Sequence, residues 1–256
     1  YLYILLICFF SSIIVYFDQK LIFIPFTLFV LILFLKVDFK YKLTSFFLFL
    51  LFSFPYIYLI SLWGSIIPTS AALSRKVGLS LDFYNPVYCV TIIAFYIFPF
   101  LMCNSFKSFT FLKEKLNKNF FLIIGIFAIY FLIIGHFYEF NNIGTDGKGA
   151  FFKLSLILIK DSSYRFIITF FTFILSIIII LMFFDKKKDL FFILYFLILS
   201  LLTIPFYQEY LDPLLFILIF TFFKTRVNLN SKNILFLAFY FIIFLLGSNY
   251  YYKIIL

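Results

Sequence analysis

The polar residues that could do chemistry are concentrated in three short segments between long apolar runs. One segment is Gln208-Glu209-Tyr210-Leu211-Asp212, which Pro213 follows directly. A charge held at the centre of a membrane helix costs about 2.5–3.5 kcal/mol, so a simple turn does not require charges so close to apolar runs. Two interpretations stay open: an external hairpin with Pro213 at the start of the next helix, or a polar cluster in a water-filled cavity that receives a polar substrate.

A second segment leaves an apolar run through Trp63, Gly64 and Pro68 and continues to Arg75 and Lys76. Trp at this position is typical of an aromatic anchor at the membrane interface. The two cations suit a phosphate or a lipid headgroup, and the alternative is a solvated pair. Further along, Asp82 and Asn85 precede Pro86, where they can form a turn before the next helix.

The third segment holds the only histidine, His136, then Glu139, and a glycine-rich stretch over 144–149 that contains Asp146 and Lys148. The backbone amides of so many glycines could approach an anion, although the spacing is not that of a nucleotide-binding loop. The alternatives are a helix cap or an interfacial residue for His136 and a surface turn for Asp146 and Lys148.

The sequence contains no arrangement typical of a metal centre, a disulfide framework or a Ser-His-Asp nucleophile. Cys8, Cys89 and Cys103 lie in or at the ends of apolar runs, without a CxxC pair or a nearby histidine. We therefore predict no metal site and no cofactor, and nothing in the sequence supports a divalent cation.

The composition indicates a membrane protein. Of 256 residues, 65% are hydrophobic and 12% are charged, whereas soluble domains are about 45–50% apolar and about 25% charged. The fold class expected is all-α, a polytopic transmembrane bundle that forms one domain over 1–256. Nine apolar runs are candidate spans: 2–17, 21–35, 43–62, 87–103, 120–135, 166–184, 190–206, 214–223 and 234–248. The decapeptide Ala150–Ile159 is too short to span and is expected to form an interfacial or re-entrant helix.

The net charge of +10 is interpreted as a topology signal rather than as a nucleic-acid surface, because cytoplasmic loops accumulate Lys and Arg. With the N-terminal end in the cytoplasm, thirteen of the 21 basic residues fall in the short inside loops. The three polar segments then face away from the cytoplasm. Short loops and a Phe-, Ile- and Lys-rich composition favour a bacterial plasma membrane.

The segment Gln208–Pro213 and the turn Trp63–Pro68 resemble motifs of polytopic glycosyltransferases of the GT-C class, which use polyprenyl-phosphate-linked sugars on the extracytoplasmic side. Glu209 stands where that late motif often carries Arg. The resemblance implies a sugar transfer in which a carboxylate deprotonates the acceptor hydroxyl and cations stabilise the departing lipid phosphate. The partners it implies are membrane lipids and the lipid-linked sugar, and the oligomeric state stays unknown.

Under this resemblance the candidate site residues fall into three groups. The phosphate contacts are Arg75, Lys76 and Lys148; the sugar or acceptor contacts are Gln208, Glu209, Tyr210 and Asp212; the unranked catalytic carboxylates are Asp82, Glu139 and Asp146. The chain starts at Tyr1 inside an apolar run, so it can lack further segments at either end, and such enzymes usually carry the catalytic acid in their first external loop. The base can therefore lie upstream of Tyr1. The alternatives are a transporter or polymerase of lipid-linked saccharides and a non-catalytic membrane subunit.

Overall fold

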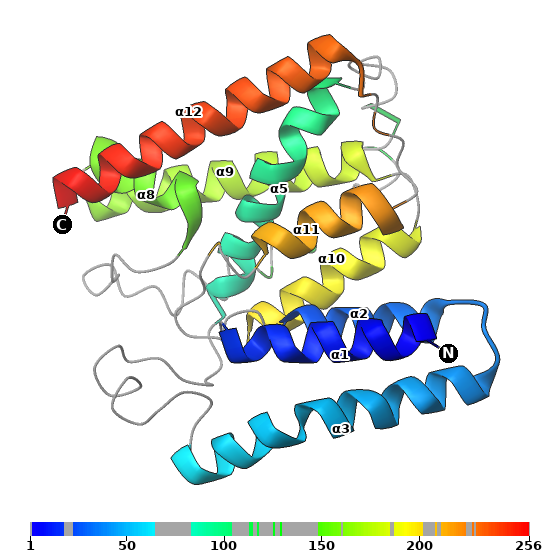
Figure 1. Ribbon diagram of the computed structural model, residues 1–256. Coiled ribbons are helices and arrows are strands. Elements are labelled where there is room, and N and C mark those ends of the chain that lie inside the picture. Colours follow the sequence, from blue (N-terminus) through cyan, green and yellow to red (C-terminus); the bar gives the residue numbers. More distant parts are fainter. Residues whose placement is uncertain are drawn as a thin grey trace. The chain divides into compact units, whose positions relative to one another are not determined.

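The computed structural model describes residues 2–17, 23–64, 83–103, 148–159, 161–184, 187–201, 211–223 and 229–255, with seven single residues, 113, 114, 117, 125, 129, 208 and 227. Within these ranges every regular element is a helix (Figure 1), which confirms the all-α class for the part described. The elements are α1 (Leu2–Phe17), α2 (Phe23–Phe34), α3 (Phe39–Trp63), α5 (Asn85–Cys103), α8 (Gly149–Leu158), α9 (Ser162–Phe183), α10 (Lys187–Ser200), α11 (Asp212–Ile217), the π-helix η3 (Leu218–Phe222) and α12 (Ser231–Ile255).

The helices coincide with the predicted apolar runs, but not all of them are long enough to span a membrane. Among the described residues, α3, α5, α9 and α12 are long and apolar enough to cross a membrane, by length and composition. These four helices indicate a membrane protein. Helices α1, α2 and α10 have 16, 12 and 14 residues, and the run 120–135 lies outside the described ranges. The predicted count of nine spans is therefore not confirmed. The decapeptide Ala150–Ile159 is a helix as predicted, α8.

The chain divides into two compact units, the first made of Tyr1–Ser80 with Asp212–Leu214 and the second of Leu81–Leu211 with Leu215–Leu256. In the first unit, α1, α2 and α3 pack on one another around a core of Cys8, Ile32 and Phe49. Aromatic edges close this core: the ring centroids of Phe29 and Phe49 lie 5.7 Å apart in a T-shaped pair. Helices α1 and α2 contain no charged residue, and the charged residues of α3, Lys40 and Lys42, lie in its first turn.

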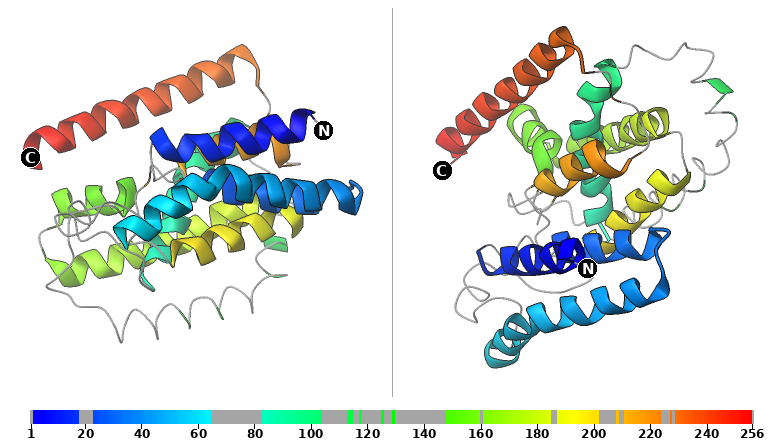
Figure 2. Two further views of the ribbon diagram at one scale, coloured as in Figure 1. Left: turned by 60° about the horizontal axis from the view of Figure 1, so that its bottom comes forward. Right: turned by 45° about the vertical axis from the view of Figure 1, so that its right-hand side comes forward.

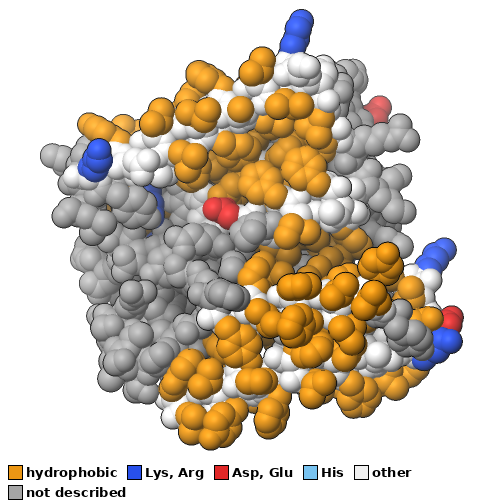
Figure 3. All heavy atoms as spheres, viewed as in Figure 1, with side chains coloured by type: hydrophobic (Ala, Val, Ile, Leu, Met, Phe, Trp, Pro, Cys, Tyr) orange, Lys and Arg blue, Asp and Glu red, His pale blue; other side chains and the backbone are white. Residues whose placement is uncertain are grey.

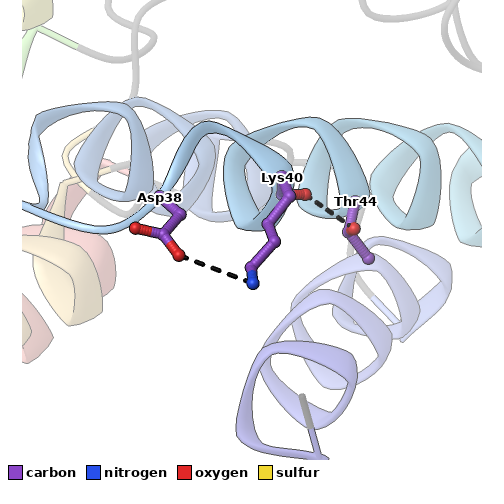
Figure 4. Close-up of polar contacts among 3 residues, drawn as sticks. All are labelled: Asp38, Lys40 and Thr44. Atoms are coloured by element: carbon purple, nitrogen blue, oxygen red, sulfur yellow. Dashed lines mark hydrogen bonds and ion pairs between the residues drawn. The ribbon is translucent and has the colours of Figure 1, made fainter.

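Polar contacts at the start of α3 fix the connection from α2. The Lys42 ammonium donates to the Leu33 carbonyl at 2.7 Å, one of the four carbonyls that the end of α2 leaves without a helical partner. Figure 4 shows the neighbouring contacts: Lys40 forms an ion pair with Asp38 at 3.6 Å, and the Thr44 hydroxyl donates to the Lys40 carbonyl at 2.7 Å. Lys40 and Asp38 are largely exposed, so their ion pair stabilises little.

Helix α5 is the core of the second unit. It contacts α8, α9, α10 and α12 (Figures 1 and 2), and nearly all of its side chains are buried. Its buried polar groups have partners: the Thr91 hydroxyl donates to the Tyr88 carbonyl at 2.8 Å, and the Cys89 thiol to the Phe196 carbonyl of α10 at 3.7 Å. A helix surrounded in this way supplies a rigid base for any group that packs against it.

Two hydrogen bonds fasten α12 to α5 at backbone carbonyls. Pro99 lies inside α5 and has no N–H, so the carbonyl four residues earlier, that of Phe95, loses its helical donor. The Tyr240 hydroxyl donates to that carbonyl at 3.1 Å. At the end of α5 the Asn233 amide donates to the Cys103 carbonyl at 3.2 Å. Neighbouring helices commonly satisfy backbone groups that proline frees within a membrane helix.

Large apolar side chains cover the outward faces of the long helices. Figure 3 shows them gathered along α12, where Leu235, Phe239 and Leu246 are each more than half exposed. Helix α3 exposes a similar set that includes Phe47, Leu51 and Phe54. A soluble protein rarely exposes apolar patches this long, so these faces fit contact with lipid.

Candidate functional site

One face of α5 gathers the polar residues of the candidate site. Tyr88, Ile92 and Tyr96 follow one another at intervals of four, so their side chains leave the same side of the helix. All three side chains are almost completely buried. Residues from two distant segments, 148–149 and 208, lie against this face, which we call the α5 tyrosine face.

Lys148 and Gly149 reach the α5 tyrosine face at the start of α8. Both have left-handed backbone conformations, with φ of 67° and 81°. The Lys148 ammonium lies 5.8 Å from the ring centroid of Tyr88 and 5.0 Å from that of Phe152, distances typical of cation–π contacts. A Cβ added to Gly149 would lie 2.5 Å from Cγ1 of Ile92. Glycine is favoured here, because an added Cβ would force Ile92 to shift and a side chain at this positive φ would strain the backbone.

Gln208 contacts the same face from a segment more than a hundred residues along the chain. Its side-chain nitrogen donates to the Tyr96 hydroxyl at 2.5 Å. Its Oε1 lies 4.0 Å from the position that a Cβ on Gly149 would take. Gln208 is therefore held between Tyr96 and the start of α8. Two of the predicted binding residues, Lys148 and Gln208, thus lie against the same face of α5.

Aromatic rings fix the side chain of Tyr96. Its ring makes a T-shaped contact with Phe216 of α11 at 5.5 Å and stacks on Phe241 of α12 at 6.1 Å. Phe216 and Phe241 also contact each other at 5.4 Å. Each such pair stabilises by about 0.5–1.5 kcal/mol beyond the area buried. The hydroxyl that meets Gln208 is thus presented by a ring with little freedom to move.

Asp212 is the third described candidate and begins α11 in the first unit. Its Oδ1 atom is buried, and in the part of the chain that the structure describes it has no hydrogen-bond partner. Burial raises the pKa of the Asp212 carboxyl to about 7, because a low-dielectric environment disfavours the charged form. A carboxyl with this pKa can take or give a proton near neutral pH.

The other predicted site residues lie outside the described residues. These are Arg75, Lys76, Asp82, Glu139, Asp146, Glu209 and Tyr210, and His136 is also among them. The structure therefore places none of the three predicted catalytic carboxylates. Within the described ranges, no three side chains of His, Cys, Asp or Glu gather as metal ligands would.

Sequence reasoning missed Tyr88 and Tyr96, although both contact predicted site residues. They lie in the middle of the apolar run 87–103, and with 19 Tyr and 46 Phe in the chain an aromatic residue in such a run carries little information. A usable signal was present nonetheless. A tyrosine hydroxyl buried in a membrane helix needs a partner, and two tyrosines eight residues apart predict one polar stripe.

No protein-family model, curated protein sequence or solved structure matches this chain.

Proposed function

We propose that the protein is a membrane glycosyltransferase that transfers a sugar from a polyprenyl-phosphate donor to an acceptor on the extracytoplasmic side. The observation that supports this most directly is that Lys148 and Gln208 both lie against the α5 tyrosine face. A lipid-phosphate sugar needs a cation for its phosphate and neutral donors and acceptors for its hydroxyls. Lys148 supplies the cation, and Gln208 with Tyr96 supplies the neutral groups.

In the proposed reaction the acceptor oxygen attacks the anomeric carbon of the sugar. The bond from that carbon to the phosphate oxygen breaks, and its electron pair leaves with the lipid phosphate. Lys148 stabilises the negative charge on the departing phosphate, while a carboxylate takes the acceptor proton. Asp82, Glu139 and Asp146 are the unranked candidates for this carboxylate.

The orientation belongs to the same proposal. The N-terminal end lies in the cytoplasm of a bacterial plasma membrane, and the segments that carry Arg75, Lys148 and Gln208 lie outside. The excess of Lys and Arg in the inside loops supports this arrangement, as does the acidic and glycine-rich content of the outside segments. The apolar faces of the long helices would contact the donor's polyprenyl chain as well as the bilayer.

The test is a transfer assay on the full chain in lipid nanodiscs. The probes are polyprenyl-phosphate glucose and polyprenyl-phosphate mannose, and the readout is the release of free polyprenyl phosphate with each acceptor sugar supplied. We expect Lys148→Gln and Gln208→Ala each to lower kcat/KM by about tenfold to a hundredfold, the loss of one hydrogen bond to a charged or tightly held group. Lys40→Gln, at an exposed ion pair, is the matched control and should retain the activity.

Three results would count against the proposal. Full activity in both site variants would remove the α5 tyrosine face from the reaction. Movement of the lipid-linked sugar across a sealed vesicle without release of polyprenyl phosphate would identify a transporter. If the chain neither releases polyprenyl phosphate nor moves the lipid-linked sugar, and a second protein purifies stably with it, the chain is a non-catalytic subunit.

A further inference from the structure

Helix α8 has two apolar faces with different surroundings. Phe152 and Ser155 are buried, and Gly149 packs against Ile92 of α5. On the other side, Phe151, Leu154, Ile157 and Leu158 are exposed, at spacings that place them along one side of the helix. We call these four residues the α8 stripe. Leu154 alone is 51% exposed, so the described part of the chain leaves the stripe uncovered.

The length of α8 excludes a transmembrane position for it. Ten residues make a helix of about 15 Å, roughly half of the hydrocarbon thickness of a bilayer. The four long apolar helices nevertheless indicate that the protein lies in a membrane. An exposed apolar stripe on a short helix of such a protein fits the boundary between headgroups and acyl chains, where amphipathic helices bury one face by about 5–10 Å.

The charge on α8 indicates which lipid it meets. Lys153 precedes Ile157 by four residues and so borders the α8 stripe. Helix α8 contains no acidic residue. The Lys153 ammonium lies 5.3 Å from the ring centroid of Tyr251, which holds the lysine stem beside the helix. Lysines at the edge of an apolar stripe attract anionic headgroups.

We propose that α8 is a lipid-contact helix that lies in the membrane interface, with the α8 stripe against acyl chains and Lys153 on the phosphate of an anionic phospholipid. This inference is independent of the sugar-transfer proposal, because it uses only the exposed side of α8. The inference also concerns the candidate site, because Lys148 and Gly149 at the start of α8 lie against the α5 tyrosine face. A lipid that shifts α8 would therefore shift these two residues as well.

The test measures the depth of α8 in the bilayer. Leu154→Cys, and as a second variant Ile157→Cys, are labelled with an environment-sensitive fluorophore in the full chain, reconstituted in phosphatidylcholine vesicles with spin-labelled lipids. The native cysteines are buried, and the unsubstituted chain supplies the labelling blank. We expect a lipid label near the headgroup to quench the fluorescence roughly twofold more than a label deep in the acyl chain. The matched control is Phe171→Cys on α9, exposed near the middle of a long apolar helix, where the deep label should quench more.

The headgroup is tested with phosphatidylglycerol that carries the shallow label. We expect it to quench the Leu154 probe about fivefold more effectively than labelled phosphatidylcholine, the effect of one lysine near an anionic surface. Lys153→Gln should remove this preference and Lys153→Arg should keep it. The proposal is overturned if Leu154 and Ile157 are quenched by neither lipid, if they are quenched like Phe171, or if the phosphatidylglycerol preference persists in Lys153→Gln.

Discussion

The hydroxyl of Tyr240 on α12 donates to the carbonyl of Phe95 on α5 at 3.1 Å, and this carbonyl is the one that Pro99 deprives of its helical donor. A side chain of α12 thus supplies the hydrogen bond that the proline of the buried helix α5 cannot donate. Because α12 is only sparsely buried along its length, such polar contacts, with the aromatic contacts of Tyr240 and Phe241 to α5, decide where α12 sits.

The first prediction concerns this hydrogen bond. Tyr240→Phe should lower the free energy of unfolding by about 0.6–1.7 kcal/mol, the range for interhelical hydrogen bonds within a membrane. The measurement is an SDS titration of the purified protein. Tyr250→Phe is the matched control, because this tyrosine of the same helix is 65% exposed and its loss should cost little.

A double-mutant cycle separates this bond from general packing. In a Pro99→Ala background the restored N–H can donate to the Phe95 carbonyl, so Tyr240→Phe should then cost clearly less than in the native chain. An equal cost in both backgrounds would show that the tyrosine stabilises through something other than the freed carbonyl.

The second prediction concerns Gly149. Gly149→Ala should destabilise by about 1–3 kcal/mol, because the new Cβ would overlap Ile92 and the residue has a positive φ. The same change should reduce any activity that depends on Lys148 and Gln208. Gly247→Ala is the control, since nothing lies within 4 Å of its added Cβ, and there the gain in helix propensity should stabilise by about 0.5–1 kcal/mol. Equal tolerance of both substitutions in thermal unfolding would refute the tight contact.

The third prediction concerns pH. Burial raises the pKa of Asp212 from 3.8 to about 7, so the folded state holds a proton that the unfolded chain releases above about pH 4. The contribution of protonated Asp212 to the stability of the folded state is complete below pH 3.8, the pKa of this carboxyl in the unfolded chain, and is lost as the pH rises to about 7. We expect stability to fall by on the order of 1 kcal/mol over this window after screening by solvent, and Asp212→Asn to flatten that slope. The measurement is thermal unfolding at several pH values. If stability depends on pH in Asp212→Asn as it does in the native chain, the pH dependence belongs to another group.

The fourth prediction concerns the connection between α2 and α3. Lys42→Met removes the donor to the Leu33 carbonyl and should destabilise by about 0.5–1 kcal/mol. Lys40→Met removes an exposed ion pair and a contact of the ammonium with the Tyr41 ring, so its effect should stay within about 0.5 kcal/mol. The comparison requires unfolding data on both variants under one condition. A larger loss for Lys40→Met would reverse the roles assigned to the two lysines.

The positions of the helices could be predicted from the sequence because long apolar runs leave a backbone in lipid no other way to satisfy its polar groups. The run 2–17 matches α1 in its bounds, and 87–103 matches α5 except for its first two residues. The predicted number of nine spans is not confirmed, since four helices of the described part are long and apolar enough to span a membrane. Runs such as 21–35 and 190–206 yield helices of 12 and 14 residues, and apolarity alone does not separate a span from a shorter buried helix.

Which residues share the site was only half predictable. Lys148 and Gln208 stood out because they interrupt apolar sequence. Their position against one face of α5 depends on contacts across large separations: Gln208 and Tyr96 are 112 residues apart, and no local pattern encodes such a pair. Pro99 was a signal that sequence reasoning did not use. A proline inside a helical apolar run leaves one backbone carbonyl without its helical donor, which predicts a donor from another helix, here Tyr240.

The hydrogen bond between α5 and α12 can form only after the ribosome has synthesised both helices. Phe95 and Tyr240 are 145 residues apart, and at about 5–20 residues per second the ribosome needs roughly 7–29 s to travel between them. During that interval the Phe95 carbonyl lacks its donor from Tyr240. A nascent chain that stalls before α12 is made would keep α5 without this hydrogen bond.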